Sequence, residues 1–117
     1  MKFMLLVKAS TNSEEGHFPP QGLQDAMDRF NGELREAGVR IMAHGLYPSS
    51  RGLRIFFPGE GLPPRMEEGP FVPARQVVAG FILFEAASWE EAVAWAKRMP
   101  DPQGYGEGEI ELRQLHE

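Results

Sequence analysis

The feature that most constrains the fold of this sequence is a nearly continuous apolar run at residues 77–84, VVAGFILF. Eight such residues without polar alternation are typical of a central strand that is covered on both faces. Gly80 inside the run indicates a bulge, or the close approach of another group. Any fold for this chain therefore has to cover both sides of this strand.

Strand and helix patterns alternate around the apolar run. Short apolar blocks or alternating patterns predict further strands at 3–7, 39–43, 53–57 and 109–115. Apolar residues at helical spacing predict helices at 23–37 and 89–99, the second one begun by a capping box at Ser88 and Glu91. Turn-forming residues predict loops at 9–20 and 58–75.

Two successive strand–helix–strand units predict a single domain, residues 1–117, with the α+β ferredoxin-like βαβ-βαβ sandwich fold. Both helices then cover one face of the sheet, and no third helix is left for the other face. We expect a second copy of the chain to shield it, which gives a homodimer whose sheets pack face to face as a dimeric α/β barrel. The alternative is a monomer in which residues 58–75 fold over the sheet.

Composition excludes several classes of protein. The chain has 12 Lys and Arg against 17 Asp and Glu, a net charge of −5, which argues against direct nucleic-acid binding. It has no Cys, which excludes thiol catalysis and disulfides and fits a cytoplasmic protein. The apolar runs are far shorter than the about 20 residues of a membrane span. The first run is also too short for a signal peptide, so we expect no membrane association.

His44 is the first candidate for acid–base catalysis. It is predicted near the end of a strand, and a neutral imidazole is a suitable general base near pH 7. The alternative is a histidine at the surface or at an interface that only makes hydrogen bonds. The three His residues are isolated from one another, and the glycines of residues 58–64 match no phosphate or dinucleotide motif. No metal and no cofactor are therefore predicted.

The second candidate is Glu68, in the stretch EEGPFVPARQ at residues 67–76. Consecutive residues of an extended chain point to opposite sides, so only one of Glu67 and Glu68 is expected to enter a pocket. Repulsion between two adjacent carboxylates favours the protonated form of one of them. The alternative is that the Glu68 carboxylate accepts backbone amides in the turn.

Four further residues are candidates for substrate binding. Arg54 and Arg75 could hold an anion by paired hydrogen bonds, or could instead form ion pairs with Glu67 or Glu68. Phe71 is a candidate pocket wall, although a place in the dimer core explains it better. The Tyr47 hydroxyl could orient a ligand, and simple packing explains this residue equally well.

Several segments together resemble the YCII-related family, and more closely its branch named for an Asp-Gly-Pro-Phe motif. The segments are MKFMLLV, LREAGV, GLYPS, EGPF, GFILFEAASWEEAVAWAKRMP and EIELRQL, which follow one another over nearly the whole chain. The resemblance implies a dimeric α/β barrel with ferredoxin-like halves. Most members of that family are uncharacterised. Some occur beside or fused to extracytoplasmic-function sigma factors, and one relative is described as a dehydrochlorinase of a chlorinated hydroxyquinol.

The chain departs from the family pattern at three places. Glu68 stands where the motif has Asp, and Pro73 stands in a region where the family has an acidic residue. Arg75 keeps the positive charge of the Lys that follows in the family. The His–Asp pair proposed as catalytic in smaller members has no counterpart, because residues 26–39 contain no His.

Two functions remain open from the sequence. The first is a small-molecule enzyme or binder, with a cleft in the dimeric barrel and with acid–base chemistry such as elimination or isomerisation. The second is a non-catalytic regulatory or interaction module, for example a partner of a sigma factor. A concave site with convergent His44 and Glu68 favours the first, and an exposed apolar patch without a polar pocket favours the second.

Overall fold

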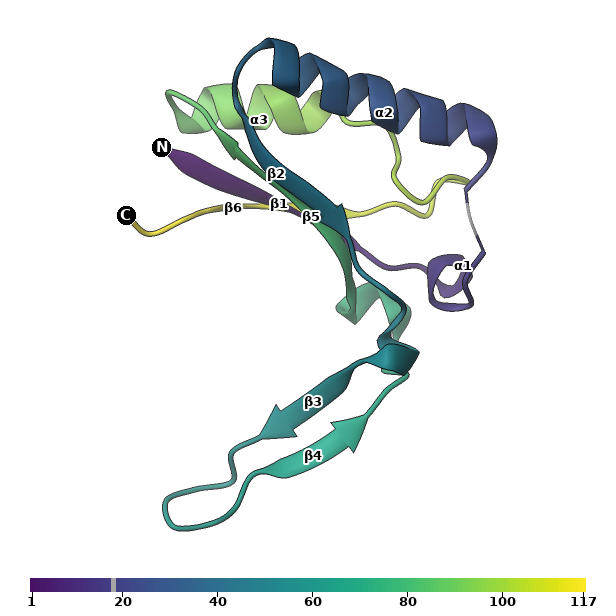
Figure 1. The fold of residues 1–117 in the computed structure, drawn as a ribbon, viewed down its shortest axis with the longest axis vertical. Coiled ribbons are helices and arrows are strands. Elements are labelled where there is room, and N and C mark those ends of the chain that lie inside the picture. Colours follow the sequence, from purple (N-terminus) through teal and green to yellow (C-terminus); the bar gives the residue numbers. More distant parts are fainter. Residues whose placement is uncertain (18) are drawn as a thin grey trace.

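The computed structural model describes residues 1–17 and 19–117, so Phe18 in the predicted loop 9–20 lies outside the described residues. These described residues form six strands, three α-helices and two short 3-10 helices (Figure 1). Their bounds are β1 Lys2–Lys8, α1 Thr11–Glu14, α2 Gln21–Glu36, β2 Arg40–Gly45, η1 Ser49–Arg51, β3 Leu53–Phe56, β4 Arg65–Glu68, η2 Ala74–Gln76, β5 Val78–Glu85, α3 Trp89–Arg98 and β6 Ile110–Gln114.

Four of the strands form one sheet in the order β2-β5-β1-β6, and all neighbours are antiparallel. This order arises from two interleaved βαβ units, β1-α2-β2 and β5-α3-β6, and it confirms the predicted α+β ferredoxin-like class. Both long helices lie on the same side of the sheet (Figure 1). We refer to the sheet and its helices as the body of the molecule.

The core of the body lies between the sheet and the helices. Phe3 and Leu5 of β1, Phe84 of β5 and Leu34 of α2 are fully buried there. Strand side chains alternate between faces, so the intervening residues of β1 and β5 point to the other side of the sheet. In α3, the Ser88 side chain accepts the Glu91 amide at 3.1 Å, as predicted, while the Glu91 carboxylate binds the Ala87 amide.

Both predictions about Gly80 are confirmed. The pairing of β1 with β5 shifts after Val7, which leaves Ala79 as an extra residue on β5 beside Gly80. A Cβ at Gly80 would lie 2.9 Å from the carbonyl oxygen of His44 on β2. Glycine at this position therefore lets β2 pair closely with β5, and it fixes the place where His44 stands.

Within residues 1–17 and 19–117, no other layer covers the side of the sheet that faces away from the helices (Figure 1). The pairing register places ten side chains on this open face, namely Lys2, Met4, Leu6, Met42, His44, Phe81, Leu83, Glu85, Glu111 and Arg113. Its centre is apolar. At the β6 edge, the carboxylate of Glu111 pairs with Arg113 at 3.1 Å and with Lys8 at 3.9 Å.

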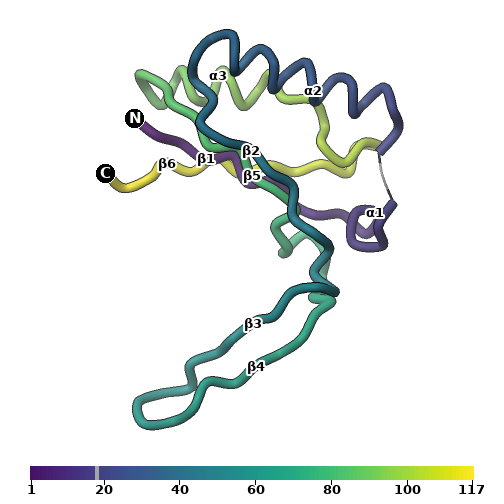
Figure 2. Tube along the Cα trace, in the orientation of Figure 1, coloured from purple at the N-terminus to yellow at the C-terminus, as the bar shows by residue number. Residues whose placement is uncertain are grey.

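Strands β3 and β4 form a separate hairpin, which we call the arm (residues 53–68). The arm extends away from the body, and both ends of it meet at one narrow base (Figure 2). The prediction of a structureless connection at 58–75 is therefore wrong in part, because Arg65–Glu68 pair with β3. The arm does not fold over the sheet, so the monomer alternative with this segment as a roof is also wrong.

Smaller differences concern the ends of elements. Phe57 follows β3 rather than ending it, and Thr11–Glu14 form a one-turn helix inside the predicted loop 9–20. That helix has a capping box in which the Ser10 and Ser13 side chains bind each other's backbone amides. Gly32 in α2 marks no close contact, because a Cβ there would meet nothing within 4 Å.

Candidate functional site

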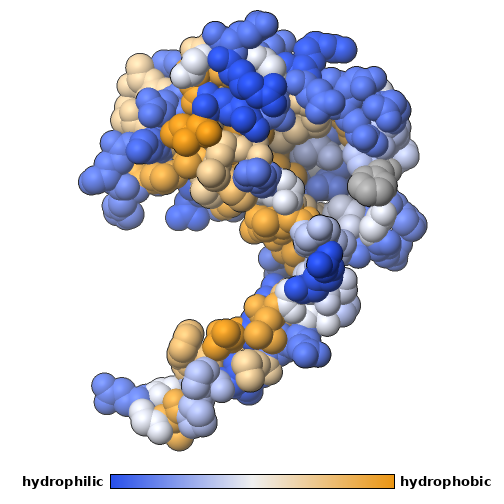
Figure 3. All heavy atoms as spheres, in the orientation of Figure 1, coloured by the Kyte–Doolittle hydropathy of each residue, from blue (hydrophilic) through white to orange (hydrophobic). Residues whose placement is uncertain are grey.

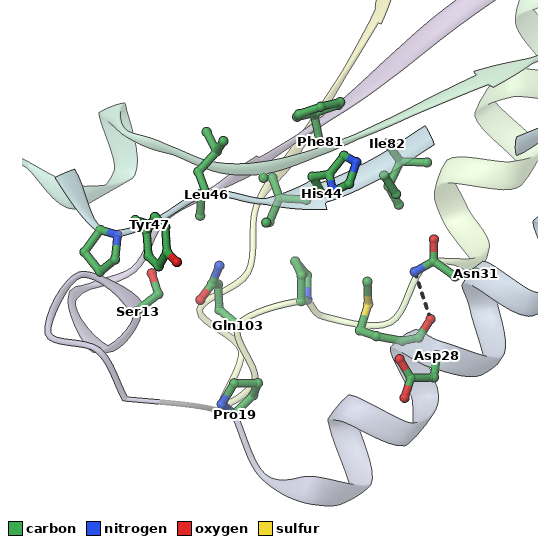
Figure 4. Close-up of a pocket in the computed structure, with 18 of the residues that line it drawn as sticks. Ser13, Pro19, Asp28, Asn31, His44, Leu46, Tyr47, Phe81, Ile82 and Gln103 are labelled. Carbon is green, nitrogen blue, oxygen red and sulfur yellow. Dashed lines mark hydrogen bonds between the residues drawn. The ribbon is translucent and has the colours of Figure 1, made fainter. Parts of the chain in front are cut away.

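A hollow in the surface lies between α2 and the β2 edge of the sheet. Its volume is about 630 Å³, and it is open to solvent on one side. Figure 4 shows the sheet residues on one side of it, Asp28 and Asn31 of α2 opposite them, and Pro19 and Gln103 closing its end. We refer to this hollow as the α2–β2 cavity.

The floor of the α2–β2 cavity is apolar because it is made by the helix-facing side of the strands. Ala43 of β2 pairs with Ile82 of β5, so both side chains point toward α2. Val7 of β1 and Met27 of α2 complete this floor. An apolar ligand surface would therefore meet an apolar floor beneath the polar rim.

Hydrogen bonds fix the polar groups of the wall. The Asn31 amide donates to the Met27 carbonyl at 3.1 Å and accepts from Nε of Arg40 at 3.2 Å. Arg35 of α2 also lines the cavity. Two guanidinium groups and the Asp28 carboxylate thus give this wall a net positive charge in a chain whose total is −5.

Gln103 is held at the end of the cavity. Its amide donates to the Lys8 carbonyl at 3.0 Å, and its side-chain oxygen accepts from the Ser10 hydroxyl at 3.3 Å. Sequence reasoning missed Asn31, Arg40 and Gln103 as site residues. No local motif marks them, because a helix, a strand start and a loop supply one each, and only the fold brings them together.

His44 lies where the cavity wall meets the open face. It pairs with Phe81 in the register of β2 and β5, and the two rings are 6.1 Å apart at an interplanar angle of 57°. The side chain is exposed, and within the described residues no hydrogen bond engages its ring nitrogens. The imidazole is therefore accessible to a ligand or to water.

Tyr47 borders the α2–β2 cavity and a second hollow and is 73% exposed. The guanidinium carbon of Arg51 lies 3.8 Å from the centre of its ring. This cation–π contact orients the ring and leaves the hydroxyl at the surface. Of the six predicted site residues, Tyr47 and His44 are the ones that line the α2–β2 cavity.

The second hollow has a volume of about 530 Å³ and lies at the base of the arm. It contains two other predicted residues, because the guanidinium carbon of Arg54 stands 4.0 Å above the centre of the Phe71 ring. Arg54 is thus used in a contact within the chain. Glu67, its partner in register, pairs with Arg65 at 3.7 Å.

The Glu-Gly-Pro-Phe corner anchors this base to the body. The Phe71 amide donates to Oγ of Ser49 at 2.9 Å, and the Ser49 hydroxyl and amide both donate to the Glu14 carboxylate. Gly69 packs against the Ser49 carbonyl so closely that a side chain has no room there. The corner, which contains cis peptide bonds before Pro70 and Pro73, therefore has a clear structural role.

The remaining two predicted residues lie elsewhere. Glu68 ends β4 opposite Leu53, and Arg75 lies in η2; both are exposed, and neither lines the two hollows described here. Within residues 1–17 and 19–117, neither side chain makes an ion pair or a hydrogen bond. One chain therefore does not bring Glu68 to His44.

In the described part of the chain, no group of three or more His, Cys, Asp or Glu is placed to hold a metal ion. None of the helices there is long and apolar enough to cross a membrane.

Comparison with known proteins supports the resemblance in the sequence. Among curated proteins, no significant match to this chain is found. The family model of the YCII-related domain, in contrast, matches residues 1–117, which is the whole chain. The chain therefore belongs to the YCII-related family.

Proposed function

We propose that this protein binds, and by acid–base chemistry transforms, a small molecule in the α2–β2 cavity. The observation that carries the proposal is the cavity itself. Its volume of about 630 Å³ is typical of small-molecule sites, and it combines an apolar floor with a few convergent polar groups. The positive charge of Arg35 and Arg40 favours a ligand with an anionic group and an apolar body.

His44 is the proposed general acid or base, because it borders the cavity at the β2 edge, its side chain is exposed on the open-face side of that strand, and its ring nitrogens make no hydrogen bond within the described residues. Tyr47 is proposed to orient the ligand. No prosthetic group is part of the proposal. We further propose that the protein is a cytoplasmic homodimer. The roles predicted for Glu68, Arg54, Phe71 and Arg75 remain predictions, and they depend on the position of the partner chain.

A thermal-shift screen against a metabolite library tests this function. A ligand is expected to raise the unfolding temperature of the wild type, and Ala43→Leu, which fills the apolar floor, is expected to abolish that rise. His44→Ala is expected to retain binding and to lose turnover. His116→Ala, a change at an exposed terminal histidine, is the matched control and should behave as the wild type does.

Two results would reject the proposal. One is a set of ligands that stabilise the wild type and Ala43→Leu equally, which would place the binding outside the cavity. The other is full turnover by His44→Ala with any substrate identified. Glu68→Gln, tested beside these variants, decides whether that carboxylate contributes at all.

A second function is favoured by a different observation. Phe57 and Leu62 at the tip of the arm are 82% and 61% exposed, which is typical of a protein-binding segment. A regulatory module that meets another protein is therefore the alternative. This alternative would be favoured if the metabolite screen identified no ligand and if Phe57→Ser lost binding to a protein partner.

A further inference from the structure

We propose that the arm is the element by which two copies of this chain dock. The apolar face of each arm covers the open face of the partner's sheet, and the same contact occurs twice around a twofold axis. This inference rests on the homodimer of the proposed function, and it identifies the surfaces that form the dimer.

The first argument is the excess surface of a single chain. Its accessible surface is 7823 Å², whereas a folded monomer of 13.1 kDa is expected to expose about 6,400 Å². Its radius of gyration is 16.1 Å, against about 13 Å for a compact domain of this length. The excess of about 1,400 Å² exceeds the about 800 Å² per partner that a stable interface usually buries.

The second argument is the arrangement of side chains on the arm. Leu53, Ile55 and Met66 share one face by register and are 49%, 50% and 67% exposed, with the Glu68 carboxylate beside Leu53 at the base end of this face. On the other face, the Arg65 guanidinium carbon lies 4.3 Å from the centre of the Phe56 ring and Arg65 also pairs with Glu67. One face is therefore satisfied within the chain, while the apolar face has no partner there.

The third argument is the open face of the sheet. Five apolar side chains form its centre, and nothing in the described part of the chain packs over them as a layer (Met4, Leu6, Met42, Phe81 and Leu83). Hydrophobic side chains also line the hollow between the body and the arm, on both of its sides (Figure 3). The hollow therefore suits an apolar occupant.

A second copy fits this hollow better than another protein does. It supplies an apolar arm for the open face and an open face for the apolar arm, so that one interface covers both unpartnered surfaces of each chain. The charges at the rim of the open face are offset within the chain, because Glu111 pairs with Lys8 and Arg113, and Lys2 lies opposite Glu85 in the register. A dimer in which each arm lies on the open face of the other chain is thus the simplest arrangement that buries the excess surface.

The first test is the double variant Ile55→Lys/Met66→Glu. These residues are directly opposite each other in the hairpin, so the new charges can pair and keep the arm folded. We expect the dissociation constant of the dimer to rise about a hundredfold or more, measured by light scattering after size exclusion. Tyr105→Lys, at an aromatic side chain 73% exposed on the loop after α3, is the control and should remain dimeric.

The outcomes separate this inference from the proposed homodimer. A wild type that is monomeric at every concentration overturns both. A dimeric wild type whose double variant is folded by circular dichroism and equally dimeric overturns the arm contact alone. A folded, monomeric double variant supports the arm contact.

The second test uses the absence of Cys from the chain. One preparation carries Ile55→Cys on the arm and another carries Leu83→Cys on the open face. After mixing and subunit exchange, a short bifunctional maleimide is expected to join the two different chains. Cross-linking no greater than that of Ile55→Cys mixed with Tyr105→Cys would contradict the proposed contact.

Discussion

Alternating apolar residues are buried in the body of this protein but remain exposed in the arm. In the body, alternating apolar residues such as Phe3 and Leu5 are fully buried against two helices. In the arm, the alternating residues Leu53 and Ile55 remain about half exposed, although they pair in a hairpin of the same antiparallel type. Strand pairing satisfies the backbone in both regions, but only the helix-facing side of the body's sheet also buries its apolar side chains.

An alternating pattern therefore predicts that one face of a strand will be covered, but it does not predict what covers that face. In the body, the helices of the same chain cover one face of the sheet. The open face and the arm have no such cover, and they are the two surfaces for which we propose a second copy. The contrast between body and arm is therefore open to direct tests by substitution.

The largest expected effect is that of Phe84→Ala in the body. Phe84 is fully buried and its ring lies 5.9 Å from that of Phe3, so the cavity is expected to cost about 3–5 kcal/mol of unfolding free energy. The matched change in the arm is Phe57→Ala, at a side chain 82% exposed. In dilute solution it should alter stability by less than about 0.5 kcal/mol, and urea unfolding of both variants gives the comparison. Equal losses would contradict the division into body and arm.

Gly69→Ala tests the joint between the two regions. The added Cβ would collide with the Ser49 carbonyl, so the corner must shift, at a cost of about 1–3 kcal/mol. Hydrogen exchange is expected to accelerate at 49–52 and 69–71 and to be unchanged in β1. Gly22→Ala, where a Cβ meets nothing within 4 Å, is the control. Unchanged exchange at the joint would mean that the corner does not anchor the arm.

Gly32→Ala tests whether a better helix-forming residue in α2 raises the free energy of unfolding. The added methyl group meets nothing within 4 Å, and alanine is favoured over glycine inside a helix. The variant should gain about 1 kcal/mol in thermal or urea unfolding. A loss of stability would show that α2 has a close neighbour at this position.

The smallest expected effect is that of Ile55→Ser on a single chain. Ile55 is 50% exposed, so in dilute solution the free energy of unfolding should change by no more than about 0.5 kcal/mol. The buried counterpart Ile82→Ser, at 3% exposure, should cost several times more. If Ile55→Ser destabilises the dilute protein as much as Ile82→Ser does, the arm has an apolar partner within its own chain.

The body could be predicted from the sequence because its elements carry strong local signals. The run at 77–84 is nearly continuous and apolar, the helical stripes around Leu34 and Ala92 have a clear period, and the order of these elements leaves few topologies. The bulge at Gly80 could also be anticipated, since glycine in a strand is unfavourable without a reason.

The second strand of the arm could not be predicted, because Arg65–Glu68 reads Arg-Met-Glu-Glu and has one apolar residue. Its pairing with β3 is set by the corner at Gly69 and Phe71, where the hydroxyl of Ser49, about 20 residues earlier in the chain, closes the base. Such a contact depends on the fold and leaves no mark in local periodicity.

The candidate site was predicted in part for the same reason. His44 stands out as a histidine at a strand end, whereas Asn31 and Gln103 are ordinary polar residues until the fold brings them to the same cavity. Glu68 was chosen from its motif, and in one chain it lies on the arm, away from the α2–β2 cavity.

The most direct test of the account is sedimentation equilibrium of the wild-type protein over a wide range of concentration. If the open face and the arm cover each other in a pair of chains, the mass will be twice the 13.1 kDa of one chain at micromolar concentration. A mass of one chain throughout that range would contradict the central claim.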